Sequence, residues 1–332
     1  MKAIVVEEFG PPENLVFRNV PKPIAEPGQV LIRVKAFGIN RAEMYMRKGE
    51  WAESMPIIGI ECVGLVEDCP GGELQPDTVV AALMGGLGRT INGSYAEYTV
   101  VPLTAVVSFD SKKPPLPWHE LAAIPESYAT AWQCLFGNLE LKAGQKLLIR
   151  GATSALGRAA INLAIQHGAV ITGTTRNVDR YRELHEMGVE RVELEGPDLD
   201  KRLNLAYTEK FDAVLELVGN SVLLNSLTML KRGGRLCLAG FLGGLAPFPD
   251  FNPLLQMASG VHFSFFGSFV FGTPGFPLSD VPLRKIVDMV AAGKFSTSLA
   301  KIYEFEEIQE AHKAMDANSA NGKMVVKGVE GI

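Results

Sequence analysis

The stretch GATSALG, at residues 151–157, has residue types that can bind a phosphate group. The run Lys146–Ile149, which is apolar after its first residue, precedes it, and residues 158–164, which have helix-forming composition, follow it. This order predicts a strand, a tight turn and a helix. The backbone N–H groups of such a turn point toward an anion at the helix N-terminus. Because the middle glycine of the G-x-G-x-x-G pattern is missing, an ordinary strand-to-helix turn is the alternative.

Small residues make the turn suitable for a pyrophosphate. Gly151 permits a sharp exit from the strand, and Gly157 lets the helix pack closely on the sheet. Ser154 and Ala155 are small enough for a phosphate to approach the backbone, and the Ser154 hydroxyl can donate to an oxygen. Leu156 completes the set of predicted contacts in this turn.

The end of the next predicted strand indicates which dinucleotide would bind. Enzymes that use NADH usually place an acidic residue roughly 20 positions beyond the glycines, where it binds the ribose 2′-OH. Here this strand end reads Thr174, Thr175 and Arg176, with no carboxylate. A guanidinium pairs well with a phosphate, so these residues favour NADPH. A solvated arginine without a ligand is the alternative.

Two kinds of pattern surround this predicted site. Residues 1–120 contain short Val- and Ile-rich runs separated by Gly and Pro, which predicts a β-rich domain. After the Pro-rich residues 113–117, strand and helix patterns alternate, which predicts a doubly wound parallel sheet. The run GVHFSFFGSFVFG, at residues 260–272, holds five phenylalanines and would form an edge strand of that sheet. An edge this apolar favours a homodimer, and coverage of the run by its own domain is the alternative.

The composition and net charge argue against several classes of partner. The chain has 332 residues, of which 47% are hydrophobic, and a net charge of −5, which argues against nucleic acid or anionic membranes as partners. We expect a cytoplasmic protein, since residues 1–10 lack a signal-peptide pattern and no 18-residue apolar stretch occurs. The four cysteines are scattered, without a C-x-x-C pair, so we expect them to be small buried hydrophobic residues. His167, His185 and His312 fit solvated helix positions, and Arg47 fits a surface cation.

Several motifs together resemble the medium-chain dehydrogenase/reductase superfamily. They are GATSALG, NGSYAEYTVVP at residues 92–102 and, for the quinone oxidoreductase (zeta-crystallin-like) branch, GINRAEMYMRKGEW at residues 38–51, PIIGIECVGLVE at residues 56–67, LPWHELAAIPESYATAW at residues 116–132 and NGKMVV at residues 321–326. The resemblance implies an α/β fold: a GroES-like catalytic domain at residues 1–120, completed by residues 271–332, and a Rossmann nucleotide-binding domain at residues 121–270.

The resemblance also allows a test for zinc. Zinc-dependent members place two cysteines and a histidine at positions that correspond here to Asn40, Ile60 and Glu126. An amide, an aliphatic side chain and one carboxylate do not make a tetrahedral zinc site. We therefore expect a zinc-independent member with no metal site.

Further site residues follow from the resemblance. It implies that Asn40 lies near the nicotinamide and the reacting carbonyl, and that Tyr45 contacts the substrate; a turn-forming Asn and a packed Tyr are the alternatives. Related members often place a tyrosine and a C-terminal arginine on the 2′-phosphate. Here Glu193, Leu194 and Asn318 stand at these positions, which leaves Arg176 as the main ligand and Lys323 as an aid. The other implied cofactor contacts are Thr130, Leu217, Val218, Gly219, Ala239, Gly240, Phe241, Phe266 and Ser268.

Without a metal, activation of an alcohol is weak, whereas hydride delivery to a conjugated acceptor is feasible. The sequence therefore predicts NADPH-dependent reduction of a small-molecule quinone or α,β-unsaturated carbonyl. One alternative is an enoyl-thioester reductase, which would need a basic entrance for its carrier. Another is a structural or RNA-binding protein that binds NADPH without catalysis; the negative charge and the Asn40 and Tyr45 pair argue against it.

Overall fold

The chain folds into two units, each built around its own sheet, in a computed structural model that describes residues 1–51, 53–203, 209–248, 250–329 and 331. The first unit comprises residues 1–129 and 268–332, and the second comprises residues 130–267. The limits expected from the sequence, at residues 120 and 270, stay a prediction of where separately folding domains begin and end.

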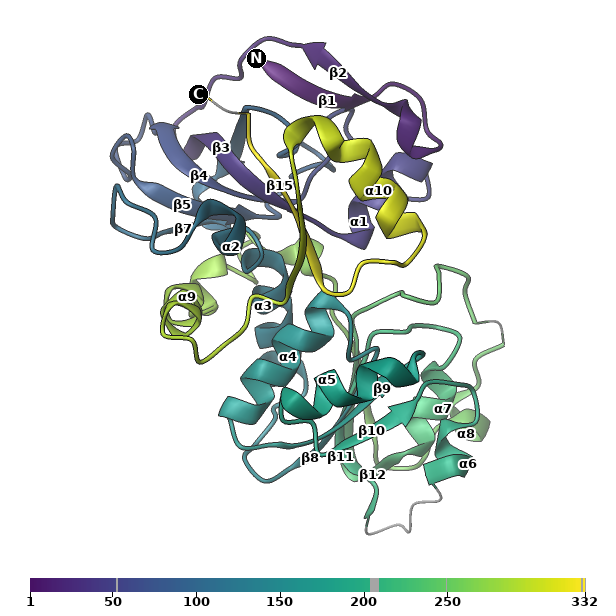
Figure 1. Cartoon of the computed structure of the whole chain (residues 1–332). Coiled ribbons are helices and arrows are strands. Elements are labelled where there is room, and N and C mark those ends of the chain that lie inside the picture. The colour runs from purple at the N-terminus through teal and green to yellow at the C-terminus, as the bar shows by residue number, and fades with distance from the viewer. Residues whose placement is uncertain (52, 204–208, 249, 330, 332) are drawn as a thin grey trace. The chain divides into compact units, whose positions relative to one another are not determined.

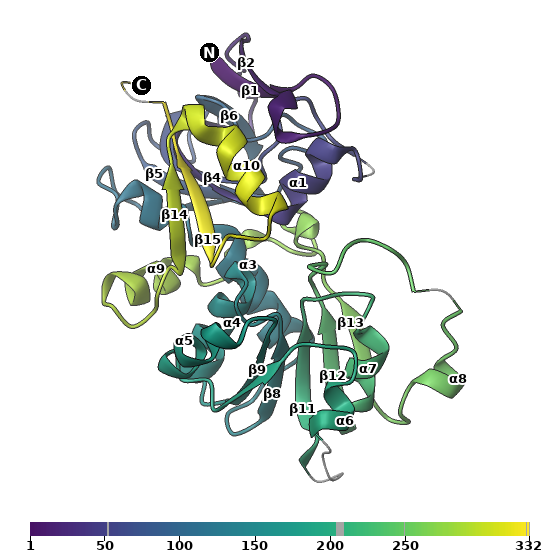
Figure 2. The same cartoon turned by 45° about the vertical axis from the view of Figure 1, so that its right-hand side comes forward.

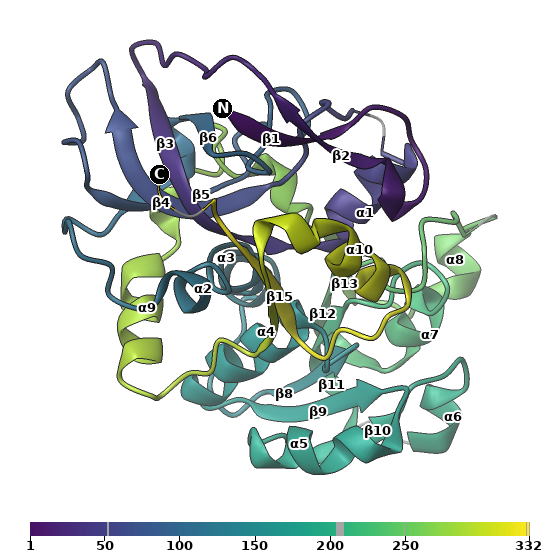
Figure 3. The same ribbon diagram turned by 45° about the horizontal axis from the view of Figure 1, so that its top comes forward.

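The first unit contains a mostly antiparallel sheet (Figures 1 and 3). Its strands pair in the order β14-β15-β3-β4-β5-β7, with β6 paired to β3. Apart from the parallel pair β14 and β15, these pairings are antiparallel. A separate hairpin pairs β1 and β2. The bounds are β1 (Lys2–Val6), β2 (Leu15–Asn19), β3 (Gln29–Ile39), β4 (Glu61–Asp68), β5 (Val79–Leu83), β6 (Tyr98–Pro102), β7 (Val106–Ser108), β14 (Leu299–Tyr303) and β15 (Lys323–Lys327).

Short helices accompany this sheet, namely α1 (Arg41–Lys48), α2 (Trp118–Leu121), α9 (Leu283–Ala291) and α10 (Ile308–Asp316). Another helix, α3 (Pro125–Trp132), runs across the limit between the two units. α10 contacts α1, so the C-terminal segment completes the core of the N-terminal one (Figure 1). The buried face of α10 holds Ile308, Ala311 and His312.

The second unit contains a parallel sheet with the strand order β10-β9-β8-β11-β12-β13 (Figure 2). Its strands are β8 (Lys146–Arg150), β9 (Val170–Thr175), β10 (Arg191–Leu194), β11 (Phe211–Glu216), β12 (Leu230–Leu238) and β13 (His262–Phe265). Its helices are α4 (Ala155–Gln166), α5 (Tyr181–Glu186), α6 (Leu199–Leu203), α7 (Leu223–Thr228) and α8 (Pro253–Gln256). Numbered within the unit, this order is 3-2-1-4-5-6, the doubly wound arrangement that binds dinucleotides at its switch point. The predicted fold class is confirmed.

The switch point of this sheet lies at β8 and β11, because the strand order reverses between them. Apolar side chains of β8, β11, β12, α6 and α7 form one buried cluster that includes Leu148, Val214, Leu227 and Leu236. Ligands in such sheets bind at the carboxyl ends of the strands. The residues that directly follow β8, β9, β11 and β12 are therefore candidates for ligand binding.

The last strand of this sheet, β13, is an edge strand in the described part of the chain. Phe263 and Phe265 on it are 37% and 49% exposed, so its apolar side chains are not fully covered by their own unit. Before β13, α8 lies on a long loop away from the sheet, where Leu254 and Leu255 are strongly exposed (Figure 2). Exposed apolar side chains therefore occur both on the edge strand β13 and on α8.

Two further expectations can be compared with the fold. All four cysteines, Cys62, Cys69, Cys134 and Cys237, are buried free thiols, as predicted. No helix within the described residues combines the length and the apolar character that a membrane span requires.

Candidate functional site

Asn40 stands where a strand turns into a helix. It follows Ile39, the last residue of β3, and its extended backbone (φ −130°, ψ 165°) makes it the N-cap of α1. The backbone N–H of Asn40 donates to Glu43 Oε2 at 3.0 Å. This reciprocal capping arrangement satisfies donors that a helix start leaves unpaired. The cap fixes the orientation of α1 and therefore of Tyr45 within it.

The Asn40 side chain belongs to a buried polar cluster with Glu61 and Lys323. Asn40 Nδ2 donates to Glu61 Oε1 at 2.9 Å and makes a long contact of 3.4 Å with Glu43 Oε1. Lys323 Nζ donates to Asn40 Oδ1 and to Glu61 Oε1, both at 2.5 Å. Lys323 is 1% exposed and Glu61 is fully buried. The sequence placed Asn40 at the substrate; here its amide is directed to these charged groups, and its contact with substrate stays a prediction.

Lys323 does not lie where it was predicted. We expected it to assist at the 2′-phosphate, which requires an accessible ammonium. Its Nζ is instead buried and bonded to Asn40 and Glu61. That expectation is wrong, because an unpaired Glu61 carboxylate in the core would be too costly.

Two neighbours shape this cluster. Burial raises the pKa of Glu43 to about 8, although backbone N–H donors and the charge of Lys323 lower it. Gly38, on β3, leaves the space that the cluster fills, since a Cβ at this position would overlap Glu61 Oε1 and Lys323 Cε. A side chain at residue 38 would therefore displace the ion pair.

The side chains at the positions that correspond to zinc ligands do not fit a zinc ion. Of the three positions that hold zinc ligands in zinc-dependent members, Ile60 is aliphatic, and the backbone N–H of Glu126 donates to Glu61 Oε2 at 2.9 Å. The third, Asn40, already has an ammonium 2.5 Å from its side-chain oxygen. Within the described ranges, no group of three His, Cys, Asp or Glu side chains could hold a metal ion.

Tyr45 is largely buried in α1. It is 6% exposed, and its ring stacks on Trp51 with centroids 6.4 Å apart. Burial raises the pKa of Tyr45, against the lowering charge and hydrogen bond of Arg41. The phenol therefore keeps its proton at neutral pH and can donate it in a hydrogen bond.

Two sequence-based expectations in this unit are wrong. Arg47 was expected at the surface, but its side chain is fully buried: Nε donates to His312 Nδ1 at 3.2 Å, and Nη2 lies 2.6 Å from Asp316 Oδ2. His312 was expected in solvent, but it is also fully buried and lies 3.0 Å from the Tyr95 hydroxyl. Burial lowers the pKa of His312 to about 3, so this histidine is a neutral structural link between α1 and α10.

In the second unit, residues 151–154 form the predicted turn after β8, and residues 155–157 begin α4. Gly151 has φ +81°, in the region that favours glycine, and Ser154 caps α4 by accepting from Gly157 N–H at 3.0 Å. A Cβ on Gly157 would lie 2.6 Å from Gly151 O, so only glycine lets the helix approach the turn this closely. Ala155 and Leu156 are the first residues of α4 and are partly exposed. The turn has the geometry that a pyrophosphate requires.

The predicted 2′-phosphate residues lie at the end of β9. Arg176 is exposed, whereas Thr174 and Thr175 are buried. Thr174 Oγ1 accepts from Gly151 N–H at 3.1 Å and donates to Glu195 Oε2 at 2.5 Å. The end of β9 itself has no carboxylate, but the Glu195 carboxylate lies directly beside it. The expectation missed it because Glu195 follows the neighbouring strand, β10.

The residues that follow β11 and β12 also meet at this edge of the sheet. Gly219 has φ +108°, and the N–H groups of Val218 and Gly219 donate to Glu216 Oε1 at 2.8 and 3.1 Å. Leu242 N–H donates to Leu217 O at 3.1 Å, which joins the two strand ends. The structure therefore brings together the predicted residues of the turns after β8, β9, β11 and β12, including Ala239, Gly240 and Phe241.

Three predicted residues lie apart from this group in the chain. Thr130 is buried in α3, and Phe266 is buried directly after β13; both belong to the second unit. Ser268 begins a single 3-10 turn in the first unit, to which Asn40, Tyr45 and Lys323 also belong.

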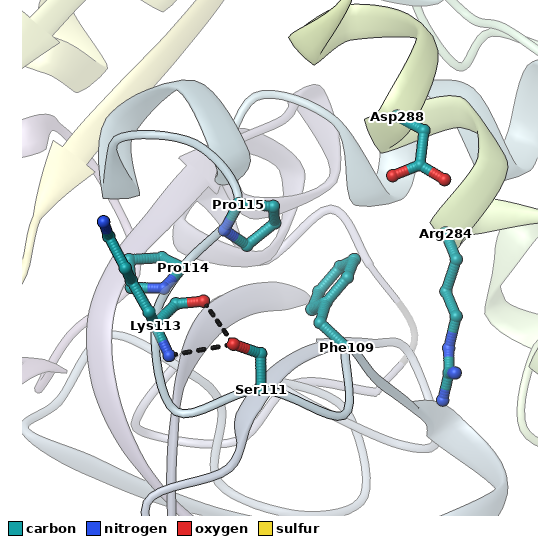
Figure 4. Close-up of a pocket in the computed structure, with 7 residues that line it drawn as sticks. All are labelled: Phe109, Ser111, Lys113, Pro114, Pro115, Arg284 and Asp288. Atoms are coloured by element: carbon teal, nitrogen blue, oxygen red, sulfur yellow. Dashed lines mark hydrogen bonds between the residues drawn. The ribbon is translucent and has the colours of Figure 1, made fainter.

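One cavity, of about 420 Å³, opens in the first unit (Figure 4). Phe109, Pro114 and Pro115 form its apolar side, and Arg284 and Asp288 of α9 face it. Ser111 Oγ accepts from Lys113 N–H at 3.0 Å, which holds the Pro-rich segment in place. None of the residues predicted to be functional lines this cavity.

Comparisons with known proteins agree with this fold. Residues 26–111 match the alcohol dehydrogenase GroES-like domain, and residues 196–326 match the family of zinc-binding dehydrogenases. Human quinone oxidoreductase is 28% identical over 341 residues, which cover 98% of this chain and 97% of that protein. The mouse quinone oxidoreductase is 30% identical over 275 residues, 78% of this chain and 77% of the relative.

Solved structures show the same fold over nearly the whole chain. An NAD-dependent alcohol dehydrogenase has a TM-score of 0.82 and 25% identity, with 98% of this chain and 99% of that chain covered. Mycobacterial Rv1454c complexed with NADPH has a TM-score of 0.85 and 22% identity, with the same coverage of 98% and 99%.

Proposed function

The chain is an oxidoreductase of the quinone oxidoreductase family within the medium-chain dehydrogenases/reductases, and from this premise we propose that it uses NADPH, without a metal, to reduce quinones or α,β-unsaturated carbonyls. Solved structures with the same fold include a quinone oxidoreductase and an enoyl reductase, so more than one class of acceptor has to be considered. The choice among them depends on the residues described above.

The position of Lys323 carries the metal-free part of the proposal. Its ammonium is 2.5 Å from both Asn40 and Glu61, and both partners therefore already hold a cation. A zinc ion beside an ammonium would meet strong charge repulsion in a low-dielectric site. This favours an acceptor that is already electron-poor over an alcohol that needs activation by a metal.

Dinucleotide binding is proposed for the carboxyl edge of the parallel sheet. The turn at residues 151–157 would hold the pyrophosphate through its N–H groups, and Arg176 would pair with the 2′-phosphate. Thr130, residues 217–219, residues 239–241, Phe266 and Ser268 would line the rest of the cofactor site. When NADPH is bound, its nicotinamide supplies the hydride.

Tyr45 is the proposed hydrogen-bond donor to the acceptor oxygen. Because its pKa is raised, the hydroxyl stays protonated. A donor aimed at an oxygen that gains negative charge stabilises the transition state more than the ground state. Asn40, held by Glu61 and Lys323, would keep α1 and thus Tyr45 in place.

A panel of acceptors tests this function. NADPH oxidation is followed with 9,10-phenanthrenequinone, a 2-alkenal and crotonyl-CoA in parallel. We expect turnover of the quinone or the alkenal. A strong preference for crotonyl-CoA would assign the protein to enoyl-thioester reduction, and no turnover of any acceptor would contradict an oxidoreductase of this kind.

Elemental analysis tests the metal-free mechanism. The purified protein should contain no stoichiometric zinc, and incubation with a chelator should leave turnover unchanged. One zinc per chain, removed together with activity, would contradict the proposal.

We also propose that two copies associate through β13. An uncovered strand edge with exposed phenylalanines can pair with the same edge of a second chain. Light scattering at micromolar concentration should give the mass of a dimer, and Phe265→Asp should give a monomer. A monomeric unmodified protein would contradict this arrangement.

A further inference from the structure

Arg150 is a buried arginine directly before the predicted dinucleotide turn. It is the last residue of β8, and its side chain has no solvent exposure. A buried guanidinium is tolerated only when its N–H groups are paired. Its partners come from the segments that follow β10 and β11. Nη1 donates to Val222 O (3.3 Å), Asn225 Oδ1 (2.9 Å) and Ser226 Oγ (2.9 Å), Nη2 donates to Gly196 O (3.1 Å) and Glu195 Oε1, and Nε donates to Glu195 Oε2 (3.2 Å).

Through Glu195, this arginine reaches the proposed 2′-phosphate position. Glu195 is 6% exposed and accepts the Thr174 hydroxyl at 2.5 Å, and Thr174 in turn accepts the Gly151 N–H at 3.1 Å. One hydroxyl group therefore separates the carboxylate from the strand end that also carries Arg176. A negative charge here would repel a 2′-phosphate and tolerate a 2′-hydroxyl.

Arg150 offsets that charge. Although burial alone would raise the pKa of Glu195, the hydrogen bonds and charge of Arg150 hold it below its usual value. The second carboxylate nearby, Glu216, lies 3.8 Å from Arg150 Nε, and burial raises its pKa to about 7. The guanidinium is thus matched to an ionised Glu195, and this pair contributes no net charge below Thr174.

We propose that Arg150 is a specificity-determining residue, which permits NADPH to bind by pairing with Glu195 and removing its negative charge from the 2′-phosphate position. The inference rests on the dinucleotide-binding function proposed above. It assigns a role in cofactor choice to a side chain that does not itself touch the cofactor.

A double-mutant cycle tests the pairing. Dissociation constants for NADPH and NADH are measured by fluorescence titration for the unmodified protein, Arg150→Met, Glu195→Gln and the double variant. Arg150→Met removes the charge that offsets Glu195. Its preference for NADPH over NADH should therefore be about tenfold lower than that of the unmodified protein, the effect of one charge at this range. The double variant should regain the original preference, and Glu195→Gln should keep or increase it.

The control is Arg235→Met, because Arg235 forms a more exposed pair with Glu140, at 2.9 Å, near the opposite, amino-terminal edge of the same sheet. This variant should leave the preference unchanged. Thermal melting separates folding from specificity. If Arg150→Met does not fold, the charge-balanced double variant and Glu195→Gln still decide: loss of the NADPH preference in both would overturn the inference.

The outcomes also separate this inference from the proposed function. An unmodified protein that binds neither dinucleotide would refute the proposed function. Normal NADPH binding with an unchanged preference in a folded Arg150→Met would refute only the role of Arg150.

Discussion

Strand β15 carries two lysine–glutamate pairs that differ mainly in burial, and their removal should have very different effects. Lys323 lies 2.5 Å from Glu61, with side chains 1% and 0% exposed. Lys327 lies 2.6 Å from Glu304, with side chains 41% and 49% exposed. Lys323→Met leaves a buried carboxylate without its cation, which typically costs about 3–5 kcal/mol. Lys327→Met removes an exposed pair, which is worth about 0–1 kcal/mol.

Thermal unfolding at pH 7 measures the difference. For a domain of this size, about 1 kcal/mol shifts the midpoint by about 2–4 °C, so Lys323→Met should lower the midpoint of the first unit by about 6–20 °C. Lys327→Met should shift it by no more than about 4 °C. Adding Glu61→Gln to Lys323→Met removes the unpaired charge and should restore part of the loss. Equal effects of the two lysine substitutions would refute the argument from burial.

Two further predictions concern the proposed chemistry, and a third concerns the pH dependence of stability. Arg176→Ala should remove most of the preference for NADPH, because one guanidinium–phosphate contact is worth roughly 1.5–3 kcal/mol, or about 10- to 150-fold in affinity; equal binding of both cofactors by the unmodified protein would exclude this role. Tyr45→Phe should lower turnover by about tenfold with nearly unchanged NADPH binding; unchanged steady-state turnover of a quinone and an enal would make Tyr45 a packing residue. The pKa of Glu216 is raised from 4.5 to about 7, so the folded state binds the Glu216 proton more tightly than the unfolded state does. The folded state therefore loses stability as the pH rises through this window. The urea midpoint of Glu216→Gln should therefore rise relative to that of the unmodified protein as the pH increases from 5 to 8. A difference between the two midpoints that does not change with pH would contradict the raised pKa of Glu216.

Local patterns were sufficient for the second unit. The strand, turn and helix at residues 146–166 are contiguous in the chain, so apolar runs, Gly151 and the Ser154 cap are enough to predict them. The edge position of β13 also followed from its composition and its place at the end of the alternating pattern, although only His262–Phe265 of the expected run 260–272 form the strand.

Long-range partners were out of reach of such patterns. Lys323 and Glu61 are 262 positions apart, and no local signal shows that they meet. His312 is a different case, since it shares the buried face of α10 with Ile308 and Ala311, at helical spacing. That signal was present in the sequence. The contact of Glu195 with Thr174 became visible only with the parallel register of β9 and β10, which pairs Glu193 with Thr174 and Leu194 with Thr175.

Lys323 also limits how a zinc site could be built in this protein. Replacing Asn40 and Glu126 by cysteine and Ile60 by histidine would supply the ligand types, but the buried ammonium would remain beside residue 40. Lys323 would therefore have to change first. We expect its loss alone to be destabilising, so an engineered conversion to a zinc site would pass through a weakened intermediate or would have to replace Glu61 at the same step.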